Sequence, residues 1–133
     1  MAFGIATVIT SVGKAVAAKR LLGATPAQAE PKFLAIGVGA TTAARTAVVA
    51  DTALSTEVET RVGTNAGTNV TTAVTNDTYQ VIQTITATAT RAVDEAALFD
   101  AASDGNMFLS ATFAVVNLAI GDSLQITAKC QFA

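Results

Sequence analysis

The stretch of sequence that decides the fold is Tyr79-Gln80-Val81-Ile82-Gln83-Thr84-Ile85-Thr86-Ala87-Thr88-Ala89-Thr90. In a β-strand successive side chains point to opposite faces, so every second residue shares a face. One face of this stretch carries Val81, Gln83, Ile85, Ala87 and Ala89, and the other carries Ile82, Thr84, Thr86, Thr88 and Thr90. Because Thr is β-branched and can hydrogen-bond to water, a row of Thr is typical of the half-exposed face of a sheet. The stretch therefore predicts a strand with one buried face.

Three other segments also predict strands. Residues 33–38 form a short apolar run that ends at Gly39, as a buried strand does. Residues 107–116 and 124–132 alternate between two faces, and Cys130 falls on the inward face of the second, where a free Cys behaves as a small hydrophobe rather than a nucleophile. The sequence Asp104-Gly105-Asn106 predicts a chain reversal before residue 107.

Several short strands separated by turn signals predict an all-β body, built as an antiparallel β-sandwich or a barrel. Residues 63–78 are rich in Gly, Thr and Asn, and they add strands or extended loops around turns. Residues 40–60 leave two possibilities open, namely a short helical turn and a loop that covers one end of the sheets.

The N-terminal region predicts an arm in front of this body. Drawn as a helix, residues 4–22 place five apolar side chains on one stripe: Ile5, Val8, Ile9, Val12 and Val16. Both prolines of the chain lie within residues 23–32, which predicts a linker. We therefore expect an arm at 1–22, a linker at 23–32 and a β-sandwich domain at 33–133. No positive charge precedes the apolar start, so the pattern does not favour a signal peptide.

The arm helix has two possible packing partners. It either packs on its own domain or reaches a neighbouring subunit, because a short isolated helix is marginal in water. The linker favours the second possibility, which makes the five stripe residues the candidate interface with a neighbouring subunit.

The composition narrows the classes of function. The chain has 133 residues, 29 of them Ala and 21 Thr, with no His, one Cys and a net charge of −2. The lack of His excludes imidazole catalysis and His metal ligands, and a single Cys excludes a Cys-rich zinc site. Eight scattered Lys and Arg do not predict a nucleic-acid surface. The charge-free stretch 1–13 is too short to span a membrane.

The acidic residues are the remaining catalytic candidates. Asp94, Glu95, Asp100 and Asp104 flank an apolar stretch, and we interpret them as solvated loop residues because Asp commonly marks turns. Gly37-Val38-Gly39 lacks the third Gly and the Lys of a phosphate-binding loop. We therefore expect no enzymatic activity, no cofactor, no bound metal and no small-molecule substrate.

The body carries a family resemblance, which spans roughly residues 33–132. It rests on five segments: 33–42 (FLAIGVGATT), 51–57 (DTALSTE), 93–107 (VDEAALFDAASDGNM), Thr112-Phe113 and 122–127 (DSLQIT). These resemble a family of small tailed-bacteriophage structural proteins, labelled tail-fibre-like or head decoration (cement) proteins. The chain departs from the family pattern at Ala97, where Gly is common, and at 128–130, where an aromatic residue often ends the chain.

The resemblance implies a jelly-roll-like β-sandwich that serves as a virion component. We expect a capsid decoration protein on the outer capsid surface, present in the host cytoplasm during assembly. Its partners would be the major capsid protein and further copies of itself in a homotrimer, with no nucleic acid or membrane. The first alternative is a tail, neck or fibre-attachment component of the virion. A more remote one is a carbohydrate-binding or surface-layer module, which the lack of Trp disfavours.

Overall fold

The alternating stretch forms the middle strand of a three-stranded sheet in the computed structural model, which describes residues 6–21 and 29–132. Strand β5 (Thr78–Thr86) lies between β4 (Thr68–Val70) and β8 (Ser123–Gln131). The face predicted to be buried is buried, at Val81, Gln83, Ile85 and Ala87. The Thr residues of the opposite face, Thr84, Thr86 and Thr88, are exposed.

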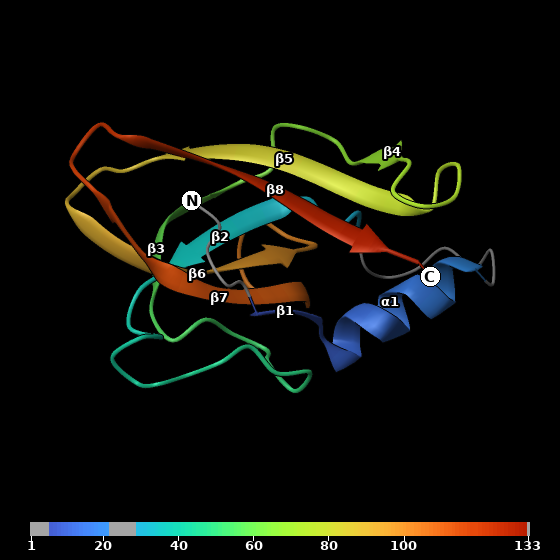
Figure 1. Cartoon of the computed structure of the whole chain (residues 1–133), viewed down its shortest axis with the longest axis horizontal. Coiled ribbons are helices and arrows are strands. Elements are labelled where there is room, and N and C mark those ends of the chain that lie inside the picture. The colour runs from blue at the N-terminus through green and yellow to red at the C-terminus, as the bar shows by residue number, and fades with distance from the viewer. Residues whose placement is uncertain (1–5, 22–28, 133) are drawn as a thin grey trace.

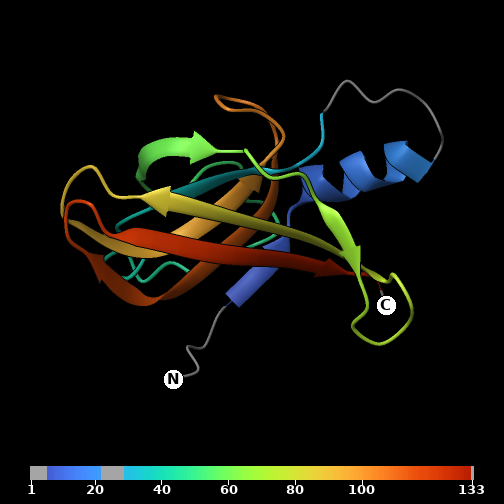
Figure 2. The ribbon, with the colours of Figure 1, turned by 90° about the horizontal axis from the view of Figure 1, so that it is seen from above.

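A second sheet of five antiparallel strands packs against the first (Figures 1 and 2). Its strands, in spatial order, are β1 (Ala6–Ile9), β7 (Met107–Leu118), β6 (Arg91–Phe99), β2 (Phe33–Gly37) and β3 (Glu57–Val62). The prediction of an all-β sandwich is therefore confirmed. The finer jelly-roll assignment stays a prediction.

The main core fills the space between the two sheets. Strands β2 and β6 contribute Leu34, Ile36 and Leu98 to it, and β5 contributes Val81 and Ile85 from the other sheet. Each such side chain is at most 2% exposed, and full burial of one stabilises the fold by about 1.5–3 kcal/mol. The predicted strands at 33–38, 107–116 and 124–132 are confirmed, the one at 79–90 is confirmed up to Thr86, and all four contribute to the core together with β6.

The outer face of the five-stranded sheet is covered by the loop at residues 38–56. Leu54 of this loop packs with Ala97, Phe99 and Met107 in a second, smaller core. Of the two possibilities for residues 40–60, the structure is therefore closer to the covering loop than to a helical turn. The last residues of this segment, 57–60, belong to strand β3. Strand β6 had no alternating signal because both of its faces are buried from Val93 to Phe99.

The arm is a strand followed by a helix, so the prediction of one helix over 4–22 is wrong for residues 6–10. Ala6–Ile9 pair with Leu109–Thr112 of β7, and helix α1 (Ser11–Leu21) begins after Thr10. The β-branched run at residues 7–10 favours a strand. Thr10 caps the helix, because its Oγ1 accepts a hydrogen bond from Gly13 N at 3.0 Å.

Helix α1 packs closely on β7 of the same chain. A Cβ atom at Gly13 would lie 2.4 Å from the carbonyl oxygen of Phe108, so only Gly allows this approach. Val16, one turn further along, belongs to the main core. Among the described residues, no helix is long and apolar enough to cross a membrane.

The predicted linker is described only from residue 29 onward, and its residues 23–28 lie outside the described part of the chain. The described end is attached to the three-stranded sheet. Tyr79 Oη donates to the carbonyl oxygen of Pro31 at 3.0 Å, and Gly67 N donates to Glu30 Oε1 at 2.6 Å. Burial raises the pKa of Tyr79, and the nearby Glu30 carboxylate raises it further.

Candidate functional site

The five residues predicted as an interface do not form one stripe. Ile5 lies outside the described residues, Val8 lies on β1, and Val12 and Val16 lie on α1. Val16 is 3% exposed, and Ile9 packs against the main core from β1. These contacts favour the alternative in which the arm packs on its own domain. The role of the five residues in an interface stays a prediction.

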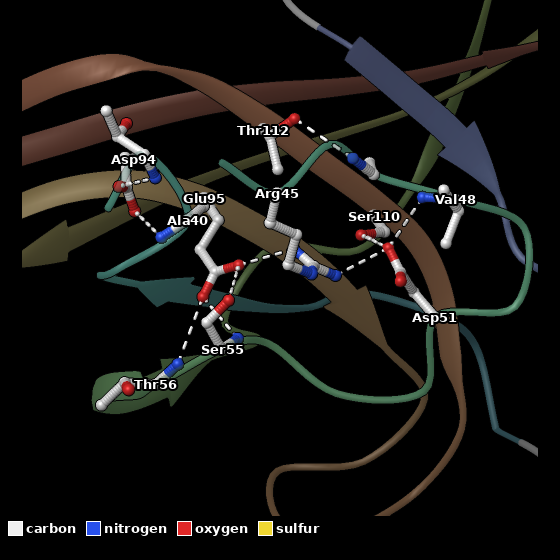
Figure 3. A network of polar contacts seen from close by, with 12 residues as sticks. Ala40, Arg45, Val48, Asp51, Ser55, Thr56, Asp94, Glu95, Ser110 and Thr112 are labelled. Atoms are coloured by element: carbon white, nitrogen blue, oxygen red, sulfur yellow. Dashed lines mark hydrogen bonds and ion pairs between the residues drawn. The ribbon is translucent and has the colours of Figure 1, made fainter. Parts of the chain in front are cut away.

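A network of buried charges lies between the outer face of the five-stranded sheet and loop 38–56 (Figure 3). It begins with two consecutive residues of β6, Asp94 and Glu95, which both bind this loop. Consecutive residues of a regular strand point to opposite faces. Here the pairing of β6 with β7 is irregular. Between the pairs Val93–Val116 and Glu95–Thr112, β6 has one residue, Asp94, whereas β7 has three, 113–115. An irregularity of this kind changes the direction of side chains, which explains why Asp94 and Glu95 both face loop 38–56.

Glu95 is the centre of this network and is fully buried. Its carboxylate accepts hydrogen bonds from Ser55 N at 2.6 Å, Ser55 Oγ at 3.2 Å and Thr56 N at 3.3 Å. Arg45 Nη1 forms an ion pair with it at 2.7 Å. Gly37 on the neighbouring strand leaves space for the carboxylate, because a Cβ atom there would lie 2.6 Å from Glu95 Oε1.

Arg45 connects Glu95 to a second acid, Asp51. Arg45 Nη2 lies 2.7 Å from Asp51 Oδ2, which also accepts hydrogen bonds from Ser110 Oγ at 2.7 Å and Val48 N at 3.0 Å. Burial alone would raise the pKa of Asp51. The hydrogen bonds from Ser110 and Val48 and the charge of Arg45 outweigh it, so the pKa lies below its ordinary value.

The other predicted loop acids have structural roles as well. Asp94 accepts hydrogen bonds from Ala40 N at 3.1 Å and Thr41 N at 2.6 Å. Asp100 closes the turn before β7 by accepting from Asn106 N at 2.6 Å and Asn106 Nδ2 at 2.9 Å. The interpretation as solvated loop residues is therefore wrong for Asp94, Glu95 and Asp100, which are 2%, 0% and 6% exposed. It is confirmed for Asp104.

The network holds loop 38–56 in place. The carboxylates of Glu95 and Asp94 are already engaged by donors from residues 40–56. Across the described ranges, no group of three or more His, Cys, Asp or Glu side chains could hold a metal ion. The hydrogen bonds and the ion pair of this network attach loop 38–56 to the five-stranded sheet. Sequence reasoning missed Arg45, because no local pattern connects it to Glu95, 50 residues away.

A second feature that the sequence did not predict is an apolar cleft between the two sheets. It has a volume of about 800 Å³ and is bordered by strand β8 on one side and β7 on the other. The lining side chains include Leu109, Phe113 and Val116 from β7 and Leu124 and Ile126 from β8. Because β8 is the last strand of its sheet, the cleft follows a sheet edge.

No protein-family model, no curated protein and no solved structure matches this chain. The function must therefore be argued from its own residues.

Proposed function

We propose that this chain is a structural component of a tailed-bacteriophage virion. The observation that carries the proposal is the segment 93–107, on which the family resemblance mainly rests. In the structure this segment is the buried strand β6 followed by a turn closed by Asp100. Its conspicuous acids, Asp94 and Glu95, anchor a loop rather than face a cleft. Such a motif suits a protein whose work is contact rather than catalysis.

More specifically, we propose a capsid decoration protein that binds the outer surface of the head as a homo-oligomer and bridges major capsid protein subunits. Burial of apolar surface across subunits contributes about 25 cal/mol per Å². Many copies, each bound weakly, then stabilise a shell strongly through multivalency. The small size, the rigidly held loop and the sandwich architecture support this role.

The second candidate is a tail, neck or fibre-attachment component, which would have the same fold but a different copy number. Quantitative gel densitometry of purified particles of the phage that encodes this chain separates the two candidates. Hundreds of copies per particle are expected for a decoration protein, whereas a dozen or fewer would support the tail alternative.

A density map of the same particles provides the decisive control. Density for the two-sheet sandwich on the outer shell, in contact with more than one capsid subunit, is the expected result. Absence of the chain from purified particles would contradict both virion proposals. Binding on a glycan array would then favour the remote carbohydrate-binding alternative.

A further inference from the structure

The four sheet edges of this molecule are not alike. An exposed edge strand offers unpaired backbone groups to another chain, and natural proteins protect such edges by short length, charge or irregularity. Strands β1 and β4 have four and three residues. Strand β3 carries Glu57, Glu59 and Arg61, and its pairing with β2 is irregular. These three edges are therefore protected.

The fourth edge, strand β8, has none of these protections. It is nine residues long and pairs with β5 without any register shift. Lys129 is its one charged residue, and it contains no Pro. Within the described ranges, β5 is its only strand partner. An edge of this kind is expected to pair with another strand.

The backbone hydrogen bonds show which residues of β8 are available. Ala87 N donates to the carbonyl oxygen of Asp122, and Phe132 N donates to the carbonyl oxygen of Asp77. The backbone N–H and C=O groups of the even-numbered residues of β8 therefore point toward β5. In an antiparallel pair of strands, residues that exchange backbone hydrogen bonds with the partner strand alternate with residues that do not. The N–H and C=O groups of the odd-numbered residues therefore point away from β5, at Ser123, Gln125, Thr127, Lys129 and Gln131.

We propose that β8 pairs with β8 of a second copy of this chain, antiparallel and around a two-fold axis at Thr127. A two-fold contact is self-complementary, so each residue must suit its partner across the axis. With Thr127 opposite itself, Lys129 lies opposite Gln125 rather than another Lys. Thr–Thr and Lys–Gln pairs are compatible cross-strand neighbours, whereas like charges directly opposite are destabilising.

The side chains on the inward face of β8 support the same register of the two β8 strands. Leu124 falls opposite Cys130 and Ile126 opposite Ala128, so each larger side chain meets a smaller one. Leu124 and Ile126 also line the apolar cleft that follows this edge. Pairing of two copies brings the two clefts together and covers apolar surface that the single chain leaves open. The result is one continuous six-stranded sheet, β4-β5-β8-β8-β5-β4.

The first test is the mass of the protein in solution, measured by light scattering over a concentration series. We expect a dimer of twice the 13.4 kDa of one chain. The variant Thr127→Lys places two Lys opposite each other, and we expect it to raise the dimer dissociation constant about tenfold or more. The matched control is Thr60→Lys, an exposed position on strand β3 of the other sheet, which should leave the dimer intact.

The second test keeps the proposal falsifiable if Thr127→Lys fails to fold. In a Cys130→Ala background, Thr127→Cys should form a disulfide with its copy, because directly opposite bonded residues lie about 5.5 Å apart at Cα. Thr84→Cys in the same background should not. This dimer departs from the homotrimer that the family resemblance implies, so a homotrimer would overturn the proposal, as would a monomer at all concentrations or a dimer insensitive to Thr127→Lys. None of these outcomes depends on the virion role, so the two proposals can fail separately.

Discussion

Gly37 and Glu95 lie directly opposite each other on the neighbouring strands β2 and β6, and the missing side chain of the first makes room for the carboxylate of the second. A Cβ atom at Gly37 would come within 2.6 Å of Glu95 Oε1. The glycine that begins the Gly37-Val38-Gly39 sequence is therefore explained by a buried acid 58 residues further along the chain, and not by a bound phosphate.

The first prediction concerns this pair of residues. Gly37→Ala forces the Glu95 carboxylate to move, and we expect a loss of about 1–3 kcal/mol in the free energy of unfolding. In a Glu95→Ala background the same change should cost much less, because the group it collides with is gone. Urea denaturation of the four proteins measures this coupling. Equal costs in both backgrounds would show that the two residues act independently.

The second prediction is the contribution of Glu95 itself. Glu95→Ala leaves Ser55 N and Thr56 N without their acceptor, while Arg45 keeps its ion pair with Asp51, so we expect a loss of about 2–5 kcal/mol in the free energy of unfolding. Glu57→Ala is the control, because Glu57 is a third exposed in its ion pair with Arg61. When Glu57 is removed, Arg61 keeps its hydrogen bonds to the carbonyl oxygens of Ala101 and Asp104, so we expect a smaller loss than for Glu95→Ala. Similar losses for the two variants in urea denaturation would disprove a special role for Glu95.

The third prediction tests the close approach of helix α1 to β7. An exposed Gly→Ala change within a helix normally stabilises by about 1 kcal/mol. At Gly13 the added methyl group meets the backbone oxygen of Phe108, so we expect Gly13→Ala to destabilise by about 1–3 kcal/mol. Ala18→Gly on the exposed face of α1 measures helix propensity alone. A more stable Gly13→Ala protein in thermal melts would contradict this packing.

The fourth prediction is a loss of stability in acid that depends on Asp77. Its carboxylate accepts backbone hydrogen bonds from Val74, Thr72 and Ala73 and a side-chain hydrogen bond from Gln131, which hold its pKa below the ordinary 3.8. A group whose folded pKa is depressed stabilises the fold above its unfolded pKa. That stability is lost as the pH falls from about 3.8 through the folded value.

We therefore expect the melting temperature of the native protein to fall on acidification below about pH 4. Asp77→Asn should already be less stable at neutral pH and should show a shallower fall. Asp104→Asn removes one exposed carboxylate that accepts no hydrogen bond from the described residues, and it controls for net charge. Parallel acid profiles for the native protein and Asp77→Asn would contradict the assignment.

The fifth prediction concerns the single thiol. Cys130 is 3% exposed in the main core, and burial raises its pKa. Since the thiolate is the reactive form, we expect native Cys130 to react with a disulfide reagent far more slowly than the same residue in urea. Comparison of the two absorbance time courses checks this. Equal rates would place the thiol at the surface.

The sequence by itself determined the strands that have one buried and one exposed face. In the segment 79–90, the alternation of Val81, Gln83 and Ile85 with Thr is a local signal that needs no partner strand. The same holds for the inward position of Cys130 and for the turn at 104–106. The strands follow from period-two patterning, which predicted an all-β body but left a sandwich and a barrel open.

Only the tertiary structure decided the rest, because the remaining features depend on contacts between distant residues. Strand β6 is buried on both faces and so has no alternating pattern, and its Glu95 is paired with Arg45, far away in sequence. The arm follows a helical apolar spacing, yet pairing with β7 makes residues 6–9 a strand. The free edge of β8 likewise follows from the order of the strands in its sheet, which no local sequence pattern specifies. Local periodicity specifies which face a residue occupies, whereas sheet order and long-range pairing specify what that face meets.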